Sequence, residues 1–140
     1  MSKFDMQSVV KAIRFIDPFD QANTTDLVSE EIDTDGFESL VLLFALGALN
    51  DLVSTVLVEH STVSGSGFTA VPDSQLNGLE TSLTIAGDDD NKVAQIGYHG
   101  DRQFVRATLV VTTGSGVNLV AGIALLGTPH RAATTASVFA

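Results

Sequence analysis

Apolar and polar residues alternate with a period of two along much of this chain, and Gly, Asn and Asp interrupt the alternation at short intervals. Residues 53–63 (VSTVLVEHSTV) show it best, because they are rich in β-branched side chains. Three further strands are predicted in the second half, at 92–98, 103–113 and 118–127. No helical period is sustained. The pattern predicts an all-β fold, an antiparallel β-sandwich of the jelly-roll kind.

The first half of the chain is less regular. Residues 9–15 (VVKAIRF) predict a first strand that Asp17-Pro18 ends. The apolar run at 37–49 (FESLVLLFALGAL) fits either a buried helix or a strand covered on both faces. The Asn50-Asp51 pair after it has turn chemistry, and it favours a β-hairpin from Leu40 to Thr62.

Shorter elements are expected between these strands. Residues 25–33 (TDLVSEEID) can form a short strand, and a second short strand is expected at 68–71. Residues 64–67 (SGSG) and 87–91 (GDDDN) have the composition of turns. A helical turn is expected within 72–78.

A chain of 140 residues has the size of one domain, and no repeat or linker divides it. We therefore expect a single domain over residues 1–140 with extended termini, an N-terminal arm at 1–8 and a C-terminal arm at 130–140. Charged residues interrupt the first fifteen positions, so we do not expect a secretory signal there.

The composition limits the chemistry that the chain can perform. The absence of Cys removes disulfides, thiolate metal sites and cysteine nucleophiles. The formal net charge of −10 and the pI near 4.3 argue against direct binding of nucleic acid, because phosphates favour a basic surface. Residues 15–91 hold fifteen acids and no Lys or Arg. This segregation fits a solvated acidic surface or head-to-tail contact between subunits.

The longest stretch without formal charge, Ala107–Pro129, is long enough to cross a bilayer, which takes about 20 residues. The polar sequence TTGSG lies in its middle, so two strands joined by a turn explain it better. We expect no membrane association.

No motif of catalysis or cofactor binding is present. HExxH, GxSxG, GxGxxG and GxxxxGK[ST] are all absent, and the three His are dispersed. Asp88-Asp89-Asp90-Asn91 offers oxygen ligands but lacks the spacing and the terminal Glu of a calcium loop, so we interpret it as a solvated turn. One Tyr and no Trp leave little surface for stacking sugars. We expect no enzyme, no metal and no cofactor.

Residues 97–102 (GYHGDR) place an aromatic and a basic residue among tight-turn residues. One interpretation is a binding tip made of Tyr98, His99 and Arg102. We favour a hairpin in which Tyr98 and Phe104 pack near the base while Arg102 pairs with an acid.

Four segments, which cover most of residues 33–131, carry a resemblance to a known family. They are DTDGFESLVLLFALGAL (33–49), VLVEHSTVSGSGFTAV (56–71), QIGYHGDRQFVRATLVVTTGSG (95–116) and LLGTPHR (125–131). Their sequences resemble small virion proteins encoded among the head genes of tailed bacteriophages. In that family the third segment is a Tyr-x-Gly turn, followed by an Arg and alternating apolar residues. Phe104 stands where Tyr is more usual.

The resemblance implies a capsid decoration or cement protein on the exterior of the virion, made in the host cytoplasm. Its partners would be the major capsid protein and copies of itself, often in a homotrimer. Each copy would bridge neighbouring capsomers by burying apolar area across their joints. We expect the N-terminal Lys3, Lys11 and Arg14 to dock on the shell. The further partner contacts expected are Tyr98, His99 and Arg102.

Two alternatives stay open. The chain can be a neck, tail or fibre-base component that uses the same β-rich packing in a ring. It can also be a glycan-binding attachment module with a site on the loops at 61–67 and 98–102.

Overall fold

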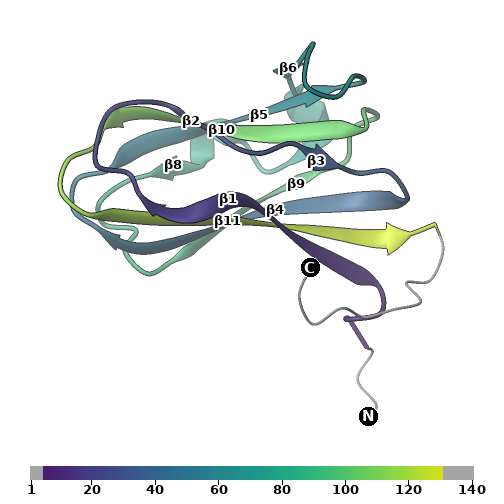
Figure 1. Ribbon diagram of the computed structural model, residues 1–140, viewed down its shortest axis with the longest axis horizontal. Coiled ribbons are helices and arrows are strands. Elements are labelled where there is room, and N and C mark those ends of the chain that lie inside the picture. Colours follow the sequence, from purple (N-terminus) through teal and green to yellow (C-terminus); the bar gives the residue numbers. More distant parts are fainter. Residues whose placement is uncertain (1–4, 131–140) are drawn as a thin grey trace.

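The structure is a computed structural model that describes residues 5–130, and the chain forms two antiparallel sheets that face each other (Figure 1). The segments 1–4 and 131–140, which include most of the predicted C-terminal arm, lie outside the described residues. The elements, in chain order, are β1 (Val10–Asp20), β2 (Leu27–Val28), β3 (Ile32–Asp33), β4 (Phe37–Leu49), β5 (Val53–Ser61), β6 (Thr69–Ala70), the 3-10 turn η1 (Asp73–Gln75), β7 (Leu76–Asn77), the 3-10 turn η2 (Glu80–Ser82), β8 (Thr84–Ile85), β9 (Val93–Tyr98), β10 (Phe104–Thr113) and β11 (Asn118–Pro129).

The five-stranded sheet has the order β1-β11-β4-β9-β7, and the six-stranded sheet has the order β2-β10-β5-β6. In the second sheet, β3 also pairs with β10 and β8 pairs with β5. The chain crosses between the sheets at each connection from β3 to β4, β4 to β5, β9 to β10 and β10 to β11. This alternation is that of a jelly roll, so the predicted all-β sandwich is confirmed.

The core lies between the sheets and is built from the inward side chains of each strand. Phe15 of β1 and Phe44 of β4 meet edge to face near its centre, with ring centroids 5.5 Å apart. Gly122 of β11 lies under this contact, and a Cβ there would meet Phe15 Cζ at 2.8 Å and Ile16 Cβ at 2.9 Å. The absence of a side chain at Gly122 therefore lets β1 lie close to β11.

The predicted hairpin from Leu40 to Thr62 is wrong, although both of its strands exist. β4 pairs with β11 and β9, whereas β5 pairs with β10, so the Asn50-Asp51 turn joins two different sheets. The fully buried Leu52 and Asn118 hold this crossing. Asn118 Oδ1 accepts the backbone N–H of Asn50, Asp51 and Leu52 at 2.8, 3.2 and 3.1 Å. Turn chemistry at Asn50-Asp51 was therefore a correct signal for a turn, but it does not select the strand that pairs.

The first strand does not stop at Asp17-Pro18 but continues to Asp20. The register of β1 against β11 shifts between Arg14 and Ile16, and again between Ile16 and Phe19. Pro18 lies within the second shift, where β1 is not paired with β11. The missing N–H of the proline therefore leaves no ladder hydrogen bond unmade. Because β1 is an edge strand, the bulge lets the strand pass the proline.

Two further predictions need correction. Residues 25–33 form two short strands, β2 and β3, which pair with different parts of β10. The predicted hairpin around Tyr98 is absent, because β9 and β10 belong to different sheets and 99–103 crosses between them. Residues 5–8, which belong to the predicted N-terminal arm, are exposed and lie in a bend and turn.

Candidate functional site

Two predicted contact residues, His99 and Arg102, lie at one end of the sandwich, which we call the loop end and define as residues 34–39, 62–68, 99–103 and 127–130; Tyr98 and Lys11 lie next to it. The strand register brings these segments together: β1 starts beside the end of β11, and the start of β4 pairs with the ends of β11 and β9. Lys11, near the start of β1, therefore lies close to the same end of the sandwich as His99. Figure 1 shows the start of β1 and the end of β11 on this side.

The six predicted contact residues differ in how accessible they are. Lys11, Arg14 and His99 are exposed, and Arg14 Nε lies 2.7 Å from Asp17 Oδ1. Arg102 is partly buried, and its Nη1 donates to Thr69 Oγ1 at 2.9 Å in place of the expected acid. Lys3 lies outside the described residues. Contact of these residues with a partner stays a prediction.

Tyr98 is buried, and its phenol oxygen organises the crossing from β9 to β10. The oxygen accepts the Arg102 backbone N–H and donates to the Arg102 carbonyl, both at 3.1 Å. His60 Nδ1 of β5 lies 3.0 Å from the same oxygen. Burial raises the pKa of the Tyr98 phenol. Burial, and then the positive charge of Arg102, lower the pKa of the His60 imidazole.

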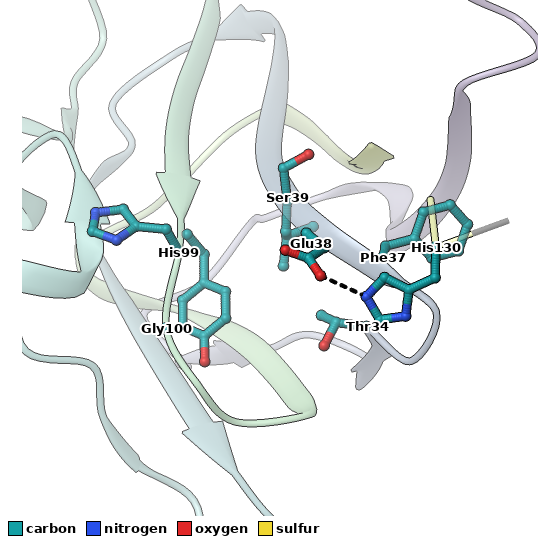
Figure 2. A pocket seen from close by; sticks show the side chains of 9 residues that line it. Thr34, Phe37, Glu38, Ser39, His99, Gly100 and His130 are labelled. Atoms are coloured by element: carbon teal, nitrogen blue, oxygen red, sulfur yellow. Dashed lines mark hydrogen bonds and ion pairs between the residues drawn. The ribbon is translucent and has the colours of Figure 1, made fainter. Parts of the chain in front are cut away.

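A shallow pocket of about 300 Å³ opens at the loop end (Figure 2). His130 Nε2 lies 2.9 Å from Glu38 Oε1 on one side of it, and His99 lies on the other side. The Tyr98 ring that borders the pocket is itself buried, so it has little free face for stacking. Within residues 5–130, no group of His, Asp and Glu is arranged to hold a metal ion.

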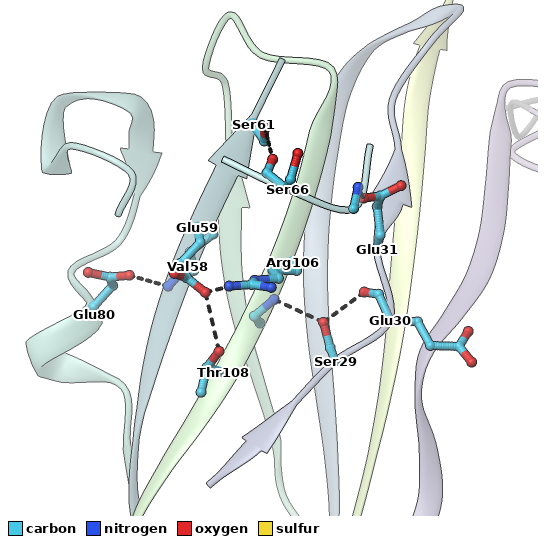
Figure 3. A network of polar contacts seen from close by, with 12 residues as sticks. Ser29, Glu30, Glu31, Val58, Glu59, Ser61, Ser66, Glu80, Arg106 and Thr108 are labelled. Carbon is cyan, nitrogen blue, oxygen red and sulfur yellow. Dashed lines mark hydrogen bonds and ion pairs between the residues drawn. The ribbon is translucent and has the colours of Figure 1, made fainter. Parts of the chain in front are cut away.

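The outer face of the six-stranded sheet carries a polar network (Figure 3). Arg106 Nε of β10 donates to Glu59 Oε2 of β5 at 2.8 Å, and Phe68 lies 4.2 Å from the guanidinium carbon. Glu80 accepts the backbone N–H of Val58, and burial raises the pKa of the Glu80 carboxyl. Partners on neighbouring strands satisfy these groups, so the arrangement is one of structural cross-links.

Backbone and side-chain groups of the chain itself bind carboxylates of the acidic turn at 88–91. Asp89 Oδ2 accepts the Ala86 N–H at 3.0 Å, and Asp89 Oδ1 receives Lys92 Nζ at 3.0 Å. Asp90 Oδ1 accepts the Leu49 N–H at 2.8 Å. The hydrogen bond from the Ala86 backbone N–H is the main reason that the pKa of the Asp89 carboxyl is lowered. Two of the three carboxylates therefore fasten the turn.

The outer face of the five-stranded sheet is apolar. Its outward side chains, which we call the apolar face, are Ala12 of β1, Val41, Leu43 and Ala45 of β4, Val93 of β9, and Leu119, Ala121, Ile123 and Leu125 of β11. Val93, Leu119 and Ile123 are 65%, 44% and 41% exposed. No other part of the described chain covers them. Sequence reasoning missed this surface, although the uninterrupted runs without a polar side chain at 40–49 and 119–127 were its signal.

Comparison of the chain with protein-family models, with curated proteins and with solved structures gave no match. No helix among residues 5–130 is long and apolar enough to cross a membrane.

Proposed function

We propose that this protein is a structural subunit of a phage virion that acts by packing against other protein subunits, and that it decorates the capsid exterior. The observation that carries the proposal is the apolar face. Monomeric soluble proteins rarely leave a large contiguous apolar surface in water, and such a surface is typical of contact with protein. The assignment to the capsid is based on the sequence resemblance, and no enzymatic role is proposed.

The contact with the shell is assigned to the basic start of the chain. Lys11 and Arg14 are exposed on the edge strand β1, in a chain whose formal net charge is −10. A basic segment at the start of β1 on an acidic protein can orient it toward an acidic patch on a partner. The many copies on one shell would each bind weakly and together stabilise the joints between capsomers.

The test is to mix the purified protein with empty expanded phage shells, sediment the shells, and locate the bound copies by cryo-EM. We expect saturable binding at the capsomer joints, and a weaker binding at higher salt. Binding unaffected by deletion of residues 1–8 and by Lys11→Glu would remove the proposed contact.

Lys92→Glu is the matched control for Lys11→Glu. Both lysines are exposed and both substitutions change the net charge equally, but Lys92 lies beside Leu46 and Asp89 at the opposite end of the sheet from the loop end. We expect Lys92→Glu to leave shell binding unchanged. Density for the protein on the neck or tail, with none on the head, would support the neck, tail or fibre-base alternative.

The glycan-binding alternative has its own measurement. An exposed aromatic ring normally stacks on a bound sugar, and the Tyr98 ring at the loop end is buried. Binding to a glycan array that His99→Ala abolishes would favour this alternative over shell decoration.

A further inference from the structure

The sequence of β4 and β11 is that of strands covered on both sides, but one side of each is uncovered in the single chain. Strands with a solvated face normally alternate between apolar and polar residues. The outward positions of β4 between Val41 and Ala45, and of β11 between Leu119 and Leu125, are all apolar. Such positions are typical of a sheet that packs against a second layer.

The outer surface of the sheet around the apolar face is large enough for a specific interface. The strands β1, β11, β4 and β9 lie about 4.8 Å apart, and an average of about eight residues of about 3.4 Å on each gives a surface of about 500 Å². The apolar face makes up about half of this surface, and polar side chains such as Ser39, Gln95 and Arg14 make up the rest. Two such surfaces in contact would bury about 1,000 Å², which is the lower limit for a specific protein interface.

The distribution of charge favours a second copy of the chain as the occupant. With a formal net charge of −10, two copies repel each other wherever their acidic surfaces approach. The outward positions of β4, β9 and β11 on the apolar face carry no charge, and the charges beside it on β1 are of opposite sign, Arg14 next to Ile123 and Asp20 next to Leu119. Two copies that meet by this face therefore bring little net charge together. A basic partner would be attracted to the acidic surfaces and not to the uncharged face.

The shape of the face suits contact with a copy of itself. An open hollow of about 420 Å³ lies beside Leu119, with the small residues Ala45, Gly47 and Ala121 along it and with Pro18, Phe19 and Asp20 of β1 at its border. Gly47 allows the Leu119 side chain to lie over β4, because a Cβ at 47 would meet Leu119 Cβ at 2.9 Å. Ile123 projects on the same face, so the face offers both a projection and a hollow.

One edge of the same sheet, the strand β1, is poorly suited to pairing between copies. It carries Lys11, Arg14, Pro18 and two register shifts. Charged side chains, proline and bulges are the features by which edge strands avoid pairing with another chain. Strand pairing through β1 is therefore disfavoured, whereas the adjoining apolar face has no such features.

We propose that a second copy of this chain covers the apolar face, and that the two copies form a pair about a two-fold axis with their five-stranded sheets face to face. Sheets packed in this way lie about 10 Å apart with interdigitated side chains. The same surface is used by both copies, so the assembly closes at two. The proposal rests on the proposed function only in treating the chain as a structural subunit. The resemblance implies a homotrimer instead, and the mass of the assembly distinguishes the two.

The experiment is sedimentation velocity on the full chain between about 1 µM and about 300 µM, a range that covers interfaces near the lower size limit. We expect the mass to rise from one chain to two with concentration. Ile123→Lys places like charges in the centre of the interface, so this variant should stay a single chain. Val53→Lys is the matched control, because Val53 is 36% exposed on the outer face of the six-stranded sheet. It should associate as the wild type does.

Several outcomes would overturn the proposal. A single chain at all concentrations, a mass of three chains, or equal association of Ile123→Lys and wild type would each do so. If a chain truncated after His130 associates while the full chain does not, residues 131–140 are the occupant instead. Circular dichroism and urea unfolding establish that Ile123→Lys is folded. Shell binding is measured separately, so a pair that fails to bind shells would overturn the proposed function and leave this inference intact.

Discussion

His60 Nδ1 and the phenol oxygen of Tyr98 lie 3.0 Å apart, and this contact joins the six-stranded sheet to the five-stranded sheet. The Tyr98 oxygen has one proton, which it donates to the Arg102 carbonyl, and it already accepts the Arg102 N–H. Its remaining lone pair needs a donor, so hydrogen counting assigns the proton of neutral His60 to Nδ1. The two rings meet edge to face, with centroids 5.8 Å apart.

The His60 contact predicts that stability falls in mild acid. Burial lowers the pKa of folded His60 below its ordinary value of 6.5, so the unfolded chain binds the proton more readily. The contribution of His60 to the free energy of unfolding is therefore complete above about pH 6.5 and is lost as the pH falls toward the folded pKa. Urea unfolding at pH 7.5 and pH 5.5 measures the loss.

His60→Gln should remove this part of the pH dependence, while His99→Gln, at an exposed position, should retain it. Tyr98, Arg102 and Asp101 are the titratable or charged groups that act on His60. An unchanged difference between pH 7.5 and pH 5.5 in His60→Gln would contradict the assignment.

Asn118→Ala should destabilise the fold strongly. The Asn118 amide accepts three backbone N–H groups at the β4–β5 crossing, and its Nδ2 donates to the carbonyls of Gln21 and Ser115 at 3.0 and 2.9 Å. In the variant the Asn50 N–H keeps the Val117 carbonyl at 3.1 Å, but the N–H groups of Asp51 and Leu52 lose their acceptor. Each buried backbone group left without a partner costs about 1–3 kcal/mol, so we expect a loss of about 3 kcal/mol in the free energy of unfolding. Asn77→Ala, at an exposed Asn, is the control and should cost under about 0.5 kcal/mol. Similar midpoints for both variants would refute the role of Asn118.

Gly122→Ala should lower the free energy of unfolding by about 1–3 kcal/mol, which is the cost of overpacking a core. The new Cβ would meet Phe15 Cζ and Ile16 Cβ at under 3 Å, and both neighbours are buried. Gly127→Ala on the same strand is the control, because its Cβ would meet only the rotatable Ser39 hydroxyl, at 2.8 Å. Thermal unfolding of the two variants compares them, and an equal loss in both would contradict the close approach of β1 to β11.

The Glu59–Arg106 pair should show a larger coupling energy than the Arg14–Asp17 pair. Its side chains are 16% and 30% exposed, whereas those of Arg14 and Asp17 are 61% and 66% exposed. Alanine double-mutant cycles should give about 1–2 kcal/mol for the first pair and under about 0.5 kcal/mol for the second, because water screens exposed pairs. Equal coupling energies would show that burial does not strengthen the first pair.

Strands were easier to predict than their partners. Alternation placed β5, β9, β10 and β11 to within a few residues, because the side chains of a strand point alternately to its two faces. The same alternation contains no information about which strand lies alongside. The predicted hairpin at Asn50-Asp51 failed for this reason, since its turn residues do not record that Leu52 would be buried between the sheets.

The candidate site was less predictable than the fold. Six residues were chosen for charge or aromatic character, and the structure exposes Lys11, Arg14 and His99 while it buries Tyr98. The apolar face was overlooked because each of its strands has apolar residues on both sides. Periodicity shows that both sides are apolar, but only the packing shows which side has no cover.

The sequence alone determined that the chain is a β-sandwich, that it lacks thiol chemistry, and that its longest strands are apolar on both faces. These properties follow from local side-chain order and composition. The tertiary structure alone decided that β4 pairs with β11, about eighty positions away, that Asn118 fastens the β4–β5 crossing, and that His60 reaches Tyr98. The physical reason is that each of these contacts depends on how distant strands share one core, and no short segment specifies that arrangement.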